Sequence, residues 1–360
     1  MENTEYDIKS MTPSEVSELI VSLGDKKFRA KQIYQWMHQK LVASYDEMTN
    51  VPAALRQKLA AEYPLTVLEP VRVQISQIDG TRKYLFRLSD GNLIESVLMK
   101  YHHGNSVCIS SQVGCRMGCR FCASTIDGLV RGLLPSEMLE QIYRIQKDIG
   151  ERVDNVVVMG SGEPFDNFDN LLRFIELLNN EEGLNISARN LTVSTCGIVP
   201  KIYELADMQP QITLAISLHS PNDELRRSIM PVANKYSIDE IMKACRYYVE
   251  KTGRRITFEY SLVKDVNDTD ECAMQLVHLV KGIKCHVNLI PVNPIKERDY
   301  KQTAQAGVNH FRSRLEKCGV NATVRREMGR DIDGACGQLR RSYMESTDLN
   351  ADAPDGIKQE

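Results

Sequence analysis

Hydrophobic residues in the first 64 positions recur at the spacing of an α-helix. Apolar stripes with this period run along three stretches, 14–23, 28–41 and 52–63. The segment KKFRAK at 26–31 places four basic residues in six. That pattern is typical of a solvated helix face, and a nucleic-acid contact is the alternative. The spacing predicts a helical N-terminal domain over residues 1–66.

Between residues 67 and 100 the hydrophobic period changes to two. The runs VRVQISQI, KYLFRLSD and LIESVLM are separated by Asp79-Gly80 and Asp90-Gly91. Both dipeptides are hairpin turn signals, because they tolerate the left-handed backbone that a tight turn needs. The pattern predicts a small antiparallel β extension.

From residue 101 to residue 341 strand patterns alternate with helix patterns. The strand candidates are SVCISS (106–111), NVVVMG (155–160), NLTVST (190–195), ITLAIS (212–217), ITFEYSL (256–262), HVNLIP (286–291) and a final ATVRRE (322–327). Helical patterns lie between them, for example at 135–149, 167–179, 237–252 and 269–281. Nearly continuous apolar strands with helices between them predict an α/β core, in which helices cover a parallel sheet. A doubly wound sheet and a partial barrel both fit this order.

Composition narrows the class of protein without defining it. The 360 residues are 42% hydrophobic and 26% charged, which is ordinary for a globular protein. No run of 18 apolar residues predicts a membrane span, and the polar N-terminus is unlike a signal peptide, so we expect a cytoplasmic protein. A net charge of −3 neither shows nor excludes a nucleic-acid partner. We expect residues 342–360 to form a disordered acidic tail.

The ten cysteines are unevenly distributed, and three of them fall within residues 115–122. Cys115, Cys119 and Cys122 have the spacing CxxxCxxC in the loop after a predicted strand. Three thiolates in a short loop can bind three irons of a 4Fe–4S cluster and leave the fourth iron open for a ligand. Zinc is the rival interpretation, with His102 or His103 as the fourth ligand. Structural thiols without a metal are the plainest alternative.

The cysteine spacing resembles that of the radical SAM superfamily, whose members cleave S-adenosylmethionine (SAM) reductively. Further segments occur in order: SQVGCRMGCRFCA, VVMGSGEP (157–164), LTVSTCGIVP (191–200), AISLHSPND (215–223), LIPVNP (289–294) and DIDGACGQLRR (331–341). From about residue 5 to residue 341 the chain resembles the RlmN/Cfr family of RNA methyltransferases. This resemblance implies a partial (β/α)6 radical SAM barrel, a 4Fe–4S cluster on the three cysteines, and two SAM molecules per turnover.

Several polar residues follow the predicted strands and are candidates for SAM binding. The glycine-rich end of the second strand allows close backbone approach, and the carboxylate beside it can accept a hydrogen bond from the SAM ammonium. Each of the others alone would fit an ordinary turn, and His219 would fit a core histidine. The resemblance implies that all of them line the SAM site: Gly162, Glu163, Ser194, Ser217, Leu218, His219 and Asn293.

Two cysteines outside the loop have catalytic roles by resemblance. Cys336 lies between small residues in a glycine-rich segment, which suits a reactive thiol. The resemblance makes Cys336 the methyl carrier, Cys108 the second catalytic thiol and Glu95 the proton acceptor. The remaining cysteines carry no motif and are interpreted as structural: Cys196, Cys245, Cys272, Cys285 and Cys318.

The implied reaction methylates carbon 2 of an adenine in the peptidyl-transferase loop of 23S rRNA, and the adenine beside the anticodon of some tRNAs. Cys336 takes a methyl group from one SAM. A radical from a second SAM abstracts hydrogen from this methyl group, and the resulting carbon radical adds to the adenine. Release leaves a Cys108–Cys336 disulfide that must be reduced. An electron donor such as flavodoxin or ferredoxin is the implied protein partner.

Three alternatives remain at this point. A Cfr-type enzyme shares the thiols but methylates carbon 8, although GEP and LIPVNP favour carbon 2. An RNA-binding protein with a structural cluster and a radical SAM enzyme acting on a peptide or lipid are the others. The chain departs from the usual family motifs at GSGEP, STCG and AST, where GMGEP, STSG and ATG are usual. Glu163, Ser194 and the three cysteines of the loop are unaffected by these departures.

Overall fold

The computed structural model describes residues 7–292, 300–332 and 337–351 of the chain. Within these ranges the apolar runs of the central region form parallel strands, as the alternating pattern predicts. The strands pair in the order in which they follow β4, which the pattern leaves open. These strands are β4 (Gly104–Ile109), β7 (Asn155–Val158), β8 (Leu191–Thr195), β9 (Thr213–Ser217), β10 (Ile256–Leu262), β11 (Cys285–Pro291) and β12 (Ala322–Val324). Their order is that of a partial barrel, since the strands follow one another around the sheet without the reversal of a doubly wound fold.

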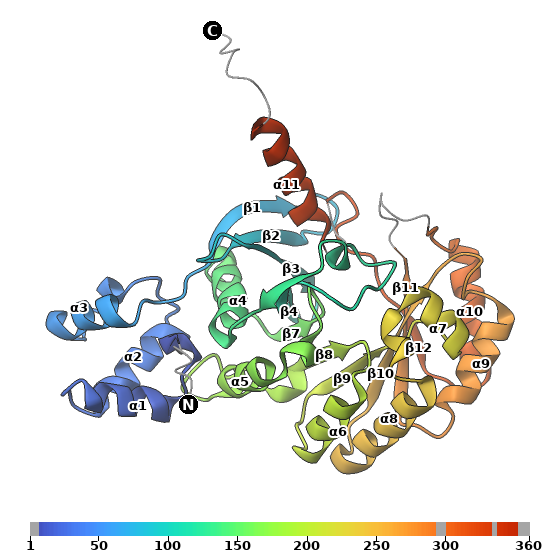
Figure 1. Ribbon diagram of the computed structural model, residues 1–360, viewed down its shortest axis with the longest axis horizontal. Coiled ribbons are helices and arrows are strands. Elements are labelled where there is room, and N and C mark those ends of the chain that lie inside the picture. Colours follow the sequence, from blue (N-terminus) through green and yellow to red (C-terminus); the bar gives the residue numbers. More distant parts are fainter. Residues whose placement is uncertain (1–6, 293–299, 333–336, 352–360) are drawn as a thin grey trace, which may run out of the picture.

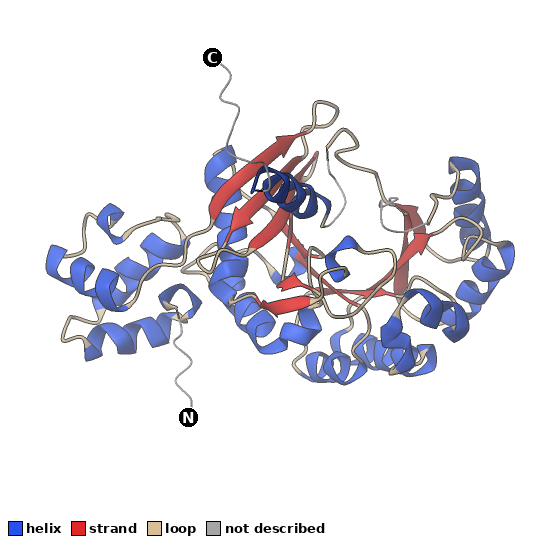
Figure 2. Ribbon diagram, turned by 45° about the horizontal axis from the view of Figure 1, so that its top comes forward, coloured by secondary structure: helices blue, strands red, loops and turns tan. Residues whose placement is uncertain are grey.

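The two faces of the parallel sheet differ in polarity. On β8, Leu191 and Val193 are fully buried, whereas Thr192 and Ser194 are only half-buried. Because successive side chains of a strand point to opposite faces, one face is apolar and the other polar. Helices cover the outer face, and Figure 2 shows them along the outside of the curved sheet. They are α4 (Pro135–Ile149), α5 (Phe168–Asn179), α6 (Val199–Asp207), α7 (Asp223–Ile229), α8 (Ile238–Thr252), α9 (Asp270–Val280) and α10 (Gln305–Lys317).

An antiparallel extension continues the same sheet. Strands β1 (Glu69–Ile75), β2 (Arg82–Arg87) and β3 (Leu93–Tyr101) form a meander, and β3 pairs antiparallel with β4. Gly80 and Gly91 have φ values of 72° and 84° in the connecting turns, a conformation that glycine adopts without strain. A separate small sheet, β5 (Gln112–Gly114) with β6 (Leu129–Gly132), brackets the cysteine loop.

The N-terminal helices form a lobe at one end of the molecule (Figure 1). A short 3-10 turn, η1 (Ile8–Ser10), precedes α1 (Pro13–Ser22), α2 (Phe28–His38) and α3 (Ala53–Glu62). Helix α1 begins with a capping box, in which the Thr12 and Glu15 side chains satisfy each other's backbone N–H groups. The lobe has a hydrophobic core of its own, which includes Val16, Ile33 and Leu59.

The expected disordered tail is wrong over residues 342–351. Helix α11 (Gln338–Ala351) begins before this stretch and continues through it. Its first turn is attached to the protein, because Leu339 is fully buried and the backbone N–H of Arg340 donates to Glu95. A helix anchored at one end can propagate through polar residues that lack a packing face. Residues 352–360 lie outside the described ranges.

In the described ranges there is no helix with the length and apolar character needed to cross a membrane.

Candidate active site

The three loop cysteines line one cavity at the carboxyl ends of the parallel strands. The cavity has a volume of about 330 Å³ and is lined by Cys115, Cys119 and Cys122 together with strand-end residues. The backbone N–H of Cys115 donates to the Gly128 carbonyl at 2.8 Å, so the β5–β6 hairpin holds one end of the loop. The backbone N–H of Cys122 donates to the Cys119 carbonyl at 3.1 Å, which curls the other end. The fold therefore turns all three thiols towards one space.

The electrostatic environment of these thiols fits a polynuclear cluster. Burial raises the pKa of Cys115 to about 12, and the nearby Cys122 contributes in the same direction. Burial also raises the pKa of Cys119, again with Cys122 and Cys115 adding to the effect. The buried thiols of Cys115 and Cys119, beside the half-buried Cys122, need a cationic centre to become thiolates. Ligands that each bind a different iron of a cluster fit this arrangement.

Gly162 and Glu163 lie at the cavity wall just after β7. Gly162 has a φ of 109°, and a Cβ there would lie 2.7 Å from the backbone nitrogen of Gln112, so only glycine fits. The Glu163 carboxylate is almost fully buried and accepts hydrogen bonds from the N–H groups of Phe165 at 2.9 Å and Cys196 at 2.7 Å. Burial raises the pKa of Glu163. A fixed, buried carboxyl group of this kind can orient a cationic ligand.

Ser194 and Ser217 come together on neighbouring strands. Their hydroxyl oxygens are 3.2 Å apart, and both residues line the cavity. Leu218 behaves differently, because its side chain is fully buried in the hydrophobic core. Its backbone is engaged as well, because the N–H donates to the Glu259 carbonyl at 3.1 Å and the carbonyl oxygen accepts a hydrogen bond from Arg226. The role of Leu218 in SAM binding stays a prediction.

His219 also lines the cavity, in a left-handed backbone conformation with a φ of 54°. Its Nδ1 accepts a hydrogen bond from the backbone N–H of Ser261 at 3.0 Å, which places the proton on Nε2. Burial lowers the pKa of His219 to about 3, so the ring is neutral. The ring packs edge-on against Phe121 of the cysteine loop, with centroids 4.8 Å apart. His219 is therefore a neutral ring that packs against the cysteine loop.

Three residues at or near the cavity were not predicted as site residues. Arg226 of α7 is fully buried and donates to the carbonyl oxygens of Cys196 at 2.6 Å and Leu218 at 3.1 Å. Glu259 of β10 is buried at the cavity wall and accepts a hydrogen bond from Asn288 at 2.8 Å. Cys196, interpreted as structural, lines the cavity as well. Only its position in the unusual STCG motif could have singled it out.

Cys108 lies on β4, nearly buried, and lines the same cavity as the loop cysteines. Cys336 and Asn293 lie outside the described residues. Gly337 directly follows Cys336 in the sequence and is described. A Cβ at Gly337 would lie 3.0 Å from the backbone nitrogen of Ser124. The segment that follows Cys336 thus runs directly against the residues that follow Cys122.

Glu95 is fully engaged in anchoring that segment. Its two carboxylate oxygens accept hydrogen bonds from the backbone N–H groups of Gly337 and Arg340, each at 2.6 Å. The ammonium of Lys83 lies 3.1 Å from the same carboxylate, and both side chains are buried. This geometry makes Glu95 the N-terminal anchor of α11, and its role as proton acceptor stays a prediction.

Comparison with known proteins agrees with this architecture. The radical SAM superfamily model matches residues 109–277, and the model of the ribosomal RNA large subunit methyltransferase N-terminal domain matches residues 6–64. The chain is similar to a solved radical SAM methyltransferase from Sphaerobacter thermophilus, with a TM-score of 0.89 and 45% identity over 92% of this chain and 98% of the other. Fold and site together define a radical SAM enzyme, a class whose members use a 4Fe–4S cluster and SAM.

Sequence relatives specify the family. A probable dual-specificity RNA methyltransferase RlmN from Lachnospira eligens is 72% identical over 342 residues, which cover 95% of this chain and 98% of the relative. The protein of the same description from Lachnoclostridium phytofermentans is 60% identical over 341 residues, 95% of this chain and 96% of the relative. This chain belongs to the RlmN family of radical SAM RNA methyltransferases.

Proposed function

We propose that this enzyme methylates carbon 2 of an adenine in RNA, with Cys336 as the methyl carrier and Cys108 as the resolving thiol. The observation that carries the proposal is that Cys108 lines the same cavity as Cys115, Cys119 and Cys122. Cys196 lines the cavity too, but Cys108 lies on the strand paired with β3, whose Glu95 holds the residue that follows Cys336. The contact of Gly337 with the end of the cysteine loop supports the same role for the segment that carries Cys336.

The chemistry explains why such a site is needed. Carbon 2 of adenine is electron-poor and has no lone pair, so it cannot attack SAM as an ordinary nucleophile would. When bound, the 4Fe–4S cluster and SAM supply a radical strong enough to activate a methyl group. The chain's own part is to hold the groups in place. Glu163, Ser194, Ser217, His219 and the Gly162 backbone face the cavity and are suited to orient SAM.

The two cysteines have different roles: Cys336 attaches the methyl group to the RNA, and Cys108 takes part in releasing the product. The Cys336 thiolate attacks the methyl carbon of SAM, S-adenosylhomocysteine leaves, and Cys336 carries the methyl group as a thioether. Once a hydrogen atom has been removed from this methyl group, its carbon bonds to the adenine. Loss of the carbon-2 proton, cleavage of the bond to Cys336 and uptake of one proton by the new carbon then free the methylated product. The Cys336 sulfur then forms a disulfide with the Cys108 sulfur, and two electrons from a reductant restore both thiols.

We propose 23S rRNA and tRNA as the substrates, and a flavodoxin or ferredoxin as the electron donor. The relatives described as dual-specificity RNA methyltransferases support the RNA substrates. On the N-terminal lobe, Lys26, Lys27 and Phe28 are exposed at the start of α2. Two cations and an exposed ring suit phosphate contacts and base stacking.

The two thiols should fail differently, which tests the proposed mechanism. Cys336→Ala removes the carrier, so RNA should remain unmodified and free. Cys108→Ala leaves attachment intact but blocks release, so protein covalently joined to RNA should accumulate. A denaturing gel would reveal the conjugate as a slow band that collapses after nuclease treatment. Cys245→Ala is the matched control, because Cys245 is buried in the core away from the cavity and should not trap RNA. Identical behaviour of the Cys108 and Cys336 variants would overturn the assigned roles.

A further inference from the structure

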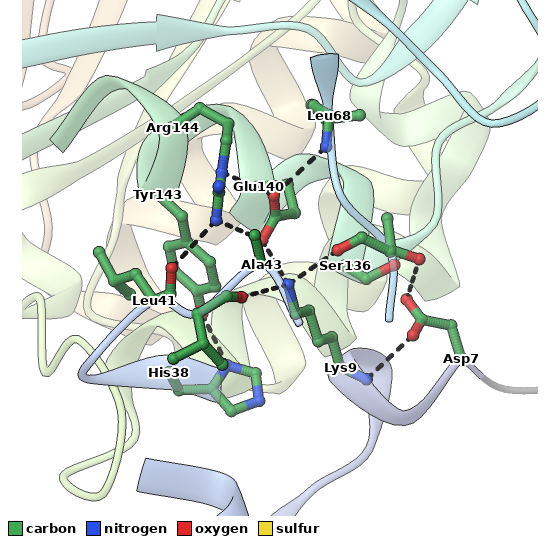
Figure 3. Close-up of polar contacts among 12 residues, drawn as sticks. Asp7, Lys9, His38, Leu41, Ala43, Leu68, Ser136, Glu140, Tyr143 and Arg144 are labelled. Carbon is green, nitrogen blue, oxygen red and sulfur yellow. Dashed lines mark hydrogen bonds and ion pairs between the residues drawn. The ribbon is translucent and has the colours of Figure 1, made fainter. Parts of the chain in front are cut away.

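A fully buried ion pair joins the N-terminal lobe to the barrel. Lys9 of η1 and Glu140 of α4 have no exposed side-chain surface, and Nζ lies 2.6 Å from Oε1. The Lys9 ammonium also donates to the carbonyl oxygens of Thr66 at 2.8 Å and Val42 at 3.3 Å. Figure 3 shows Lys9 pointing from the lobe towards Glu140 on α4. One ammonium therefore ties two other segments of the N-terminal region to a barrel helix.

Neighbouring residues of α4 extend this contact. The second oxygen of Glu140 accepts a hydrogen bond from the backbone N–H of Leu68 at 3.3 Å and pairs with Arg144 at 3.0 Å. Arg144 in turn donates to the Leu41 carbonyl at 3.1 Å. The Tyr143 hydroxyl lies 2.6 Å from Nδ1 of the buried His38 (Figure 3). Glu140, Tyr143 and Arg144, on one side of α4, therefore all form hydrogen bonds or ion pairs with the N-terminal region.

The adjoining side of α4 holds the strands that carry Glu95 and Cys108. The amide oxygen of Gln141 accepts hydrogen bonds from the Ser96 hydroxyl and the Ser110 N–H, each at 2.8 Å. Its amide nitrogen donates to the Ser110 carbonyl at 3.0 Å. Ser96 directly follows Glu95 on β3, and Ser110 lies two residues after Cys108. Glu140 and Gln141 are consecutive, about 100° apart around the helix. A single turn of α4 therefore touches both the lobe and the strands of the site.

Burial of these charges is not explained by stability. Removing two ions from water is so unfavourable that a well-packed apolar pair often serves at least as well. An ion pair with several fixed hydrogen bonds admits one defined geometry, and in some proteins buried ionic groups provide such conformational specificity. The burial of Lys9 lowers its pKa, and the nearby Glu140 carboxylate opposes this shift.

We propose that Lys9 and Glu140 are positioning residues for RNA methylation. Their ion pair fixes the N-terminal lobe on α4, so that RNA held by the lobe is presented to the cavity at a defined distance and angle. Both residues act through the lobe, since neither lines the cavity. The inference rests on the proposed function, in which the lobe contacts RNA.

The decisive variant is the double substitution Lys9→Met/Glu140→Met, which removes both charges and leaves neither unpaired. We expect it to fold but to be less stable than the wild type, because Arg144 and the Thr66 carbonyl lose buried partners. Its holoenzyme should contain wild-type iron and cleave SAM normally without RNA. Its kcat/KM for RNA should fall by roughly 10–100-fold, because misplacement far from the chemistry has effects of this size. Limited proteolysis in the linker 63–67 should be faster. Lys243→Met is the matched control, since Lys243 forms an exposed pair with Asp239 on α8.

The results of these experiments distinguish a positioning role of the ion pair from a role in the stability of the barrel. A double variant that methylates RNA like the wild type would overturn the positioning role, and so would unchanged proteolysis of the linker. A parallel loss of SAM cleavage would also overturn it, because the pair would then support the barrel itself. Lys9→Met alone, which leaves Glu140 to its pair with Arg144, provides a second test should the double variant fail to fold. A wild type that does not methylate RNA at all would instead refute the proposed function.

Discussion

Arg226 organises the ends of two strands beneath the candidate site. Its guanidinium donates to the carbonyl that follows β8, at Cys196, and to those at the end of β9, at Leu218 and Ser217. Burial lowers the pKa of Arg226, and the nearby Cys196 and Cys119 act in the opposite direction. The planar fork matches several acceptors at once, which a single ammonium cannot do. The buried cation is also well placed to offset the negative charge of cluster thiolates.

Arg226→Lys should therefore be strongly destabilising although it keeps the charge. Each buried carbonyl left without a donor costs about 1–3 kcal/mol in the free energy of unfolding. We expect a loss of this size in urea unfolding, together with weaker retention of iron after anaerobic reconstitution. Arg227→Lys is the matched control, because the neighbouring Arg227 is exposed. If the two variants unfold alike and retain iron alike, Arg226 does not organise the site.

Residues of the site differ in how well sequence could predict their surroundings. The cysteine spacing and the glycine-rich strand end are local patterns, and the structure brings those residues to one cavity. Arg226 and Glu259 lie in ordinary helix and strand patterns, so nothing local marks them. Leu218 shows a different limit of the sequence. Its motif identifies the segment near the site, but it does not tell which atoms of the segment face the cavity. Side-chain direction at a strand end depends on neighbouring strands that are distant in sequence.

Helix α2 carries a buried histidine whose charge state links pH to the stability of the N-terminal lobe. His38 has no exposed surface, and burial together with the charge of Lys9 lowers its pKa to about 3. In the unfolded chain its pKa is about 6.5. Between these values the unfolded state binds more protons than the folded state, so stability rises with pH across this window.

Lowering the pH from 6.5 to 5 should therefore reduce the free energy of unfolding of the lobe by about 2 kcal/mol through His38. Trp36, the one tryptophan of the chain, lies on α2 and reports this unfolding by fluorescence. The His38→Gln variant should be less stable at neutral pH but should lack this part of the pH dependence. Equal slopes for the two proteins would show that His38 is not the titrating group.

Other elements show which helices and strands the period of hydrophobic residues can predict by itself. Helix α4 covers the predicted range 135–149, because its apolar stripe is long and Pro135 and Gly150 mark its ends. The short strands β5 and β6 escape detection, since they have too few residues for a period. Helix α11 was missed because its stability depends on Glu95, some 240 residues away, rather than on its own sequence.

At the scale of the whole molecule, one continuous sheet joins the antiparallel extension to the barrel. Alternating strand and helix patterns predict the parallel part, and hairpin signals predict the meander. The pairing of β3 with β4 could not be read from either pattern, yet it brings Glu95 and Cys108 onto adjacent strands. The same is true of the contact between the lobe and α4, which involves charges that would normally be assigned to the surface.

The central claim is that this enzyme methylates carbon 2 of adenine in RNA. The most direct test is mass spectrometry of nucleosides from the RNA of cells with and without the gene, resolved against synthetic 2-methyladenosine and 8-methyladenosine. We predict 2-methyladenosine in both rRNA and tRNA when the gene is present, and its loss from both when the gene is deleted. Appearance of 8-methyladenosine in its place, or an unchanged level of 2-methyladenosine after deletion, would contradict the proposed function.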